Sequence, residues 1–111
     1  MAVNLVGGTT SASAALAFNA QTGTTYTFVL ADADNKLVTA SNASAQTYTI
    51  PPNSSVAYPI GSQLNIIQIG AGQVSFAQGS GVTIASNGAT STAPKLRVQY
   101  SSATAIKVNT D

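Results

Sequence analysis

The chain has 111 residues and only seven charged side chains, four Lys or Arg and three Asp, which is 6% of the sequence. A typical soluble domain carries about 25% charged residues. The sequence also has no His, Cys, Trp or Glu. These absences exclude a His-based triad, a thiol nucleophile, zinc held by His or Cys, a disulfide framework and a Glu acid/base pair.

The length is that of one domain, which we divide into an extended N-terminal arm, residues 1–8, and a β-module, residues 9–111. No apolar run reaches the ~20 residues of a transmembrane helix. The first residues, Met1 to Val6, lack the basic and long apolar regions of a secretory signal. We therefore expect no membrane insertion. The low charge is typical of a protein that associates with other copies, and composition alone fits an ordinary β-protein rich in Thr and Ser equally well.

The net charge of +1 argues against nucleic-acid binding. Such modules need a basic stripe that neutralises phosphates. The four cations are Lys36, Lys95, Arg97 and Lys107, and the last three form the only cluster that the sequence suggests. We interpret them as solvated strand residues and expect no nucleic-acid partner.

Alternation of apolar and polar side chains predicts short β-strands along most of the chain. Residues 24–30 alternate in this way, the Asx-rich stretch 32–35 favours a turn, and residues 36–40 form a further strand. We interpret this pair as a β-hairpin. The other expected strands are near Ala15–Phe18, Gln46–Ile50, Ser55–Tyr58, Gln63–Ile69, Gln73–Ala77, Val82–Ile84, Lys95–Tyr100 and Thr104–Asn109.

These nine or ten short strands and the lack of a convincing helical pattern predict an all-β, single-domain fold. We expect an antiparallel β-sandwich or a jelly-roll-like barrel. The glycine triplets 70–72 and 79–81 are interpreted as hairpin turns, and residues 87–94 as a long exposed loop. No repeat of 20–50 residues is strong enough to predict a solenoid.

The side chains expected to point into the core follow from the same alternation. They are Val74 and Phe76, then Leu96, Val98 and Tyr100, and finally Ile106 and Val108. Tyr26 and Tyr48 are also expected in the core, because they share strand faces with Leu or Ile. Tyr58 stands alone before Pro59 and is the candidate for an exposed contact, such as a glycan platform.

The two interior carboxylates, Asp32 and Asp34, lie in the predicted turn. Nothing around them indicates the apolar pocket that raises a carboxyl pKa for acid catalysis. A calcium loop would need a third oxygen ligand where Lys36 stands, and a distant Glu. The glycine triplets are not followed by a helix, so they do not form a phosphate loop. We predict no enzyme activity, no cofactor and no metal.

A succession of short blocks over the last four-fifths of the chain carries a family resemblance. In chain order the blocks are Tyr26–Ala33, Leu37–Thr39, Ser41–Ser44, Pro51–Gly61, Ile67–Val74, Gly79–Ile84 and Leu96–Thr104. In this order they resemble a module of bacteriophage virion proteins, including tail-fibre-like and other structural proteins. The resemblance implies a β-rich structural or adhesion module, often oligomeric and without catalysis. It carries over no binding residues.

The chain departs from similar sequences at its end. They usually continue past the Asn-Thr-Asp end into a further strand that bears Trp, whereas this chain stops at Asp111. Either a few terminal residues are missing, or the closing strand comes from elsewhere, such as a neighbouring subunit.

These observations lead us to expect a small virion protein that decorates or cements a capsid. We expect a homotrimer that contacts other virion proteins such as the major capsid protein. Its arm would lie against a neighbour or the shell by strand addition, with Val3, Leu5 and Val6 as contacts. The first alternative is a tail-fibre or receptor-binding domain that attaches to host surface glycan. The second is a depolymerase fragment, which would have only Asp32, Asp34 and hydroxyl groups for catalysis.

Overall fold

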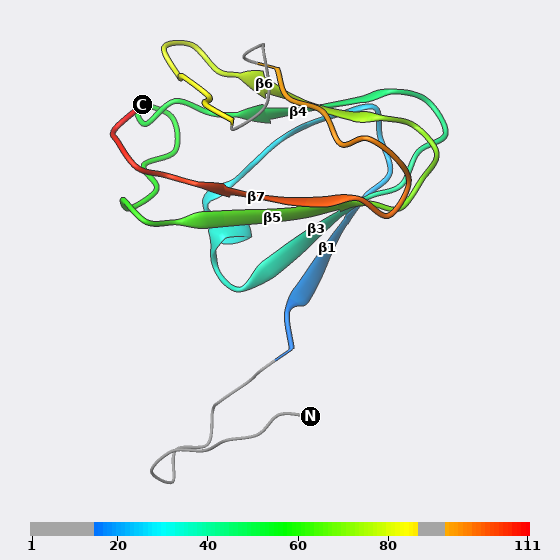
Figure 1. Cartoon of the computed structure of the whole chain (residues 1–111). Coiled ribbons are helices and arrows are strands. Elements are labelled where there is room, and N and C mark those ends of the chain that lie inside the picture. The colour runs from blue at the N-terminus through cyan, green and yellow to red at the C-terminus, as the bar shows by residue number, and fades with distance from the viewer. Residues whose placement is uncertain (1–14, 87–92) are drawn as a thin grey trace, which may run out of the picture.

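The computed structural model describes residues 15–86 and 93–111, which form seven β-strands and one short 3₁₀ helix, η1. Successive strands alternate between two sheets, so that each odd-numbered strand lies in one sheet and each even-numbered strand in the other (Figure 1). The four-stranded sheet has the order β1-β3-β5-β7, and the three-stranded sheet the order β2-β4-β6. The elements are β1 (Ala17–Gln21), β2 (Thr25–Thr27), η1 (Leu30–Ala33), β3 (Lys36–Ala40), β4 (Gln46–Ile50), β5 (Gln63–Gln68), β6 (Val74–Gln78) and β7 (Ser102–Ile106).

The first six strands form three stacked coils, β1–β2, β3–β4 and β5–β6. All four pairings between successive coils are parallel. Only the last strand, β7, runs antiparallel to its neighbour β5. The fold is therefore a short parallel β-coil with an antiparallel strand at one end, in which each coil contacts the next as in repeat proteins.

The core lies between the two sheets. On the three-stranded sheet, Tyr26, Tyr48 and Phe76 stand in one row across the strands. The four-stranded sheet presents Val38 and Ile66 from adjacent strands, both 1% exposed or less. The rings of Tyr26 and Tyr48 lie 5.6 Å apart between centroids, a separation that suits aromatic pairing.

The turns that join the two sheets stack on one another like the strands. The turn between β3 and β4 lies against the turn between β5 and β6, where the Gly72 N–H donates to the Asn42 carbonyl over 2.8 Å. The Asn42 side chain donates to the Thr22 carbonyl of the first coil, and its oxygen accepts from the Ser44 N–H. A Cβ on Gly72 would lie 1.8 Å from the Ser44 carbonyl oxygen, so the close stacking requires glycine there.

The structure confirms the all-β class, but several finer predictions are wrong. The sheets are largely parallel rather than antiparallel, and the described residues form seven strands rather than nine or ten. The predicted hairpin is absent, because β2 pairs with β4 whereas β3 pairs with β1 and β5. The glycine triplet 70–72 joins strands of different sheets instead of closing a hairpin.

Three of the predicted strands are not strands. Residues 55–58 and 82–84 are irregular, and residues 95–100 contribute a single bridge between Lys95 and Ser75. Strand β7 was expected to turn Ile106 inward, but its half-buried residues are Ala103 and Ala105, whereas Ile106 is exposed. Within the described ranges, no helix is long and apolar enough to cross a membrane.

Candidate functional site

The most buried charged group of the described residues is the carboxylate of Asp32, which is 2% exposed. Its oxygens accept hydrogen bonds from the Asn19 amide at 2.8 Å, the Tyr26 hydroxyl at 2.7 Å and the Val29 N–H at 2.9 Å. These donors come from β1, β2 and the start of η1. The carboxylate therefore ties together the first coil and the chain that leaves it.

The remaining groups around Asp32 are also paired. The Asn19 amide donates a second bond, to the Tyr26 hydroxyl, and its oxygen accepts from Gln21. The Tyr58 hydroxyl donates to the Val29 carbonyl at 2.8 Å. Asp34 is exposed, so the two carboxylates do not share a site. Among the described residues, no group of acidic, His or Cys side chains could hold a metal ion. The arrangement suits a structural role for Asp32, because its acceptor oxygens face donors of its own chain.

Three tyrosines have a raised pKa. Burial raises the pKa of Tyr48 to about 12. Burial, the hydrogen bond to Asp32 and the negative charge of Asp32 raise the pKa of Tyr26 to about 12, and burial followed by the charge of Asp32 also raises that of Tyr58. In each case the neutral phenol is favoured, because tyrosinate would be poorly solvated or beside a carboxylate.

We expect the protein to lose stability in alkaline solution. Between pH 10 and 12 the unfolded chain releases tyrosine protons that the folded chain retains, so stability is complete below pH 10 and falls as the pH rises towards 12. Tyrosinate absorbance of the folded protein should lag behind that of the same chain in denaturant. Superimposable titration curves would contradict the burial of these phenols.

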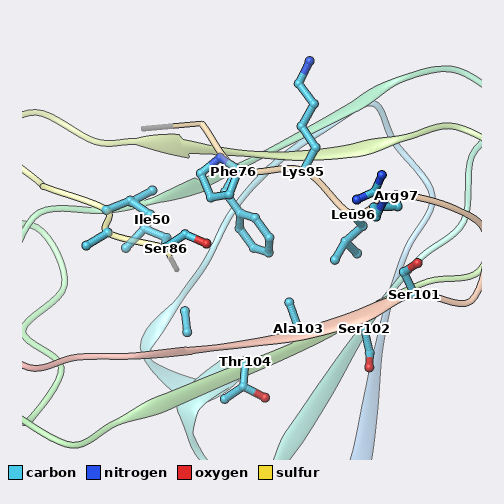
Figure 2. A pocket seen from close by; sticks show the side chains of 14 residues that line it. Ile50, Phe76, Ser86, Lys95, Leu96, Arg97, Ser101, Ser102, Ala103 and Thr104 are labelled. Atoms are coloured by element: carbon cyan, nitrogen blue, oxygen red, sulfur yellow. The ribbon is translucent and has the colours of Figure 1, made fainter. Parts of the chain in front are cut away.

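An open groove lies between the two sheets beside β7. It consists of two adjoining cavities of about 400 and 410 Å³ that share Ile50, Ile84, Ala85, Thr104 and Ala105. In the first cavity, Phe76 and Leu96 point towards Ala103 on β7 (Figure 2). Among the described residues the three-stranded sheet has no fourth strand opposite β7, and the half-buried β7 residues that line the groove, Ala103 and Ala105, have only methyl side chains. We call this feature the β7 groove.

The cations do not form one basic patch. Lys95 and Arg97 line the first cavity of the β7 groove, and Figure 2 shows the Lys95 side chain pointing away from it. Lys107 lines the second cavity, where its ammonium group donates to the Asn53 side chain at 2.7 Å and the Tyr58 carbonyl at 2.8 Å. The cluster suggested by the sequence is thus divided, and Lys107 is held by the protein itself.

A turn at residues 98–101 displays two apolar side chains. Val98 and Tyr100 are 64% and 67% exposed. Two hydrogen bonds hold the turn. The Ser101 N–H donates to the Val98 carbonyl, and the Gln99 side-chain amide donates to the Ile69 carbonyl. Tyr100 has a φ of +69°, a left-handed conformation that is unfavourable for a bulky residue.

Replacing Tyr100 by Gly should therefore stabilise the protein. Glycine adopts this conformation without the steric cost of a Cβ, which is about 1–2 kcal/mol, and part of that gain is offset by the greater freedom of glycine in the unfolded chain. Val98→Gly is the matched control in the same turn and should be neutral or destabilising. Urea denaturation of the three proteins checks the order, and a loss of stability in Tyr100→Gly would refute the strain.

The structure reverses the predicted exposure of Tyr58 and Tyr100. Tyr58 was expected to be exposed, which is wrong, because it is 6% exposed and packs in the core. Tyr100 was expected in the core, which is also wrong. Val3, Leu5 and Val6, the predicted arm contacts, lie outside the described residues. No sequence signal marked Asn19 as a partner of Asp32, whereas the spacing of Val29 and Asp32 is that of a helix-capping contact.

Comparison of the chain with family models, curated proteins and solved structures finds no match.

Proposed function

We propose that the chain is a non-enzymatic structural protein of a bacteriophage virion. In this proposal it is a small homotrimeric decoration protein that coats or stabilises the capsid and contacts the major capsid protein. The observation that carries an assembly role is the surface of the described residues. Nine large hydrophobic side chains are exposed there, whereas the chain has seven charged residues, of which Asp32 is buried. Such a surface favours burial against partners.

The virion assignment rests on the ordered sequence blocks described above. The coil adds a physical argument, because broad sheet faces without charge suit side-by-side packing on a shell. The outer face of the three-stranded sheet carries Thr25, Thr47 and Ser75 in one row and Thr27 and Thr49 in the next. An enzyme is disfavoured by the saturation of the Asp32 carboxylate by donors of its own chain.

The alternative is a tail-fibre or receptor-binding domain that attaches to host surface glycan. The observation that favours it is the exposed ring of Tyr100, held in a strained turn three residues after Arg97. Aromatic rings on exposed loops are suited to contact with partners. In this reading Tyr100 takes the place that the sequence assigned to Tyr58.

Deletion of the gene from the encoding phage separates the two functions. If the protein decorates the capsid, particles without it should adsorb normally, and their heads should break at lower temperature or lower ionic strength. If it is an adhesin, heads should keep their stability and adsorption should fall. Absence of the protein from purified particles, measured by mass spectrometry of heads and tails, would reject both.

A further inference from the structure

The outer edge of β1 is unprotected in the part of the chain that the structure describes. β1 pairs with β3 on one side, and its other side is the edge of the four-stranded sheet. Proteins usually protect such edges with Lys, Pro, a bulge or a covering segment. β1 has no charged residue and no proline, and its five residues pair with β3 in regular register. Phe18 is 69% exposed on this strand.

The other sheet edges are less suited to accept a strand. β2 has three residues. The β6 edge is already bridged, where Phe76 donates to the Pro94 carbonyl and Leu96 donates to the Val74 carbonyl. β7 is followed directly by Lys107, a charged residue whose ammonium group donates a hydrogen bond to the Asn53 side chain. The β1 edge is thus a neutral and regular edge of five residues with no charged residue directly beside it.

We infer that the β1 edge accepts residues 2–6 of a neighbouring copy as an added antiparallel strand. The inference rests on the proposed function, which supplies the trimer. It names where the arm docks. The two segments match in length and pattern, because Asn4 stands between Val3 and Leu5 as Asn19 stands between Phe18 and Ala20.

The pattern selects one register. With Asn4 opposite Asn19, antiparallel pairing places Leu5 beside Phe18 and Val3 beside Ala20 on one face of the sheet. On the other face, Asn4 lies beside the amide of Asn19, which belongs to the polar network with Asp32. A shift by one residue would turn Val3 and Leu5 towards that polar network and Asn4 towards Phe18, which opposes slippage.

The reach of the arm allows docking on a second copy. Residues 7–16 separate the arm from β1 and can span ~33 Å when extended. A ring of copies in which each donates one arm and accepts another leaves no β1 edge unpaired, as closed symmetry requires. An arm that folds back on its own copy would link no subunits, so exchange between copies is the arrangement that accounts for the trimer of the proposed function.

The chain has no Cys, so engineered disulfides give a clean test. We expect Val3→Cys and Ala20→Cys single variants, mixed and oxidised, to form a disulfide-linked pair of chains, because directly opposed residues have Cβ atoms about 4.5–5.5 Å apart. The double variant should give a covalently closed trimer on a non-reducing gel. The matched control, Val3→Cys with Thr104→Cys on β7 of the same sheet, should remain unlinked.

A disulfide formed only within one chain, a link to Thr104→Cys, or no link at all would each overturn the inference. An independent measurement is the oligomeric state of Phe18→Lys, which should fall to monomer in light scattering while Ile106→Lys at the opposite edge stays trimeric. A trimeric Phe18→Lys would also contradict the docking. Head stability of the gene-deleted phage is measured separately, so a failed cross-link with weakened heads rejects the docking and leaves the proposed function standing.

Discussion

Replacing Gly72 by Ala is expected to destabilise the protein by about 3 kcal/mol or more, the upper end of the usual cost of overpacking. The added Cβ would lie 1.8 Å from the Ser44 carbonyl oxygen and 2.7 Å from that of Asn42. Both are backbone atoms of the turn in the coil below. The clash can be relieved only by separating the two turns, which breaks the bond from the Gly72 N–H to the Asn42 carbonyl.

Gly23→Ala is the matched control. A Cβ at this position meets only the Thr25 carbonyl oxygen, at 3.8 Å, an ordinary contact. It should be neutral or slightly stabilising, because alanine restricts the unfolded chain more than glycine does. Midpoints of urea unfolding, with soluble yield as a second readout, measure the difference. Equal midpoints for Gly72→Ala and the unsubstituted protein would mean that the turns do not stack as described.

Strand positions were largely predictable from local pattern. The predicted strand 46–50 coincides with β4, and those at 63–69 and 73–77 agree with β5 and β6 within one residue. Val74 and Phe76 point into the core as expected. These strand predictions are correct because one face of each strand is buried. Burial of one face produces the alternation of apolar and polar residues from which the strands were predicted.

The pairing of the strands could not be predicted from the alternation of apolar and polar residues. A period of two is the same for a strand in a hairpin and for a strand in a parallel coil. The short connection after β1, residues 22–24, crosses to the opposite sheet instead of reversing the chain. Ala17 of the first coil pairs with Lys36 of the second, whereas Leu37 of the second coil pairs with Asn65 of the third. The second pair is further apart in the sequence than the first, so successive coils differ in length. Unequal coils leave no constant period for a repeat search to detect.

The candidate site was less predictable than the strands, because it depends on contacts between distant segments. Tyr58 is buried through its bond to the Val29 carbonyl, 29 residues earlier, and nothing near Tyr58 indicates that partner. Tyr100 follows an alternating stretch, but only Leu96 of that stretch reaches the core. The β7 groove lies where the described residues place no strand opposite β7, an arrangement that no local pattern encodes.

Replacing Asp32 by Ala should have the second large effect, a loss of about 3 kcal/mol or more. The substitution leaves the Asn19 amide, the Tyr26 hydroxyl and the Val29 N–H without this acceptor, and each unsatisfied buried donor costs ~1–3 kcal/mol. The Asn19 amide keeps one bond, to the Tyr26 hydroxyl, so the cost falls below the full sum. Asp32→Asn should also destabilise, because its NH₂ group would face donors.

Asp34→Asn is the control for Asp32, two residues away and exposed, and should stay within ~0.5 kcal/mol of the unsubstituted protein. Because the groups that donate to Asp32 lie in β1, in β2 and at Val29 just before η1, its loss should first loosen the first coil. Hydrogen exchange in Asp32→Asn should therefore rise in β1 and β2 before it rises in β5 and β6. Uniform exchange through all three coils would show that the network supports the whole fold, whereas selective exchange would show that Asp32 stabilises the first coil, which includes β1.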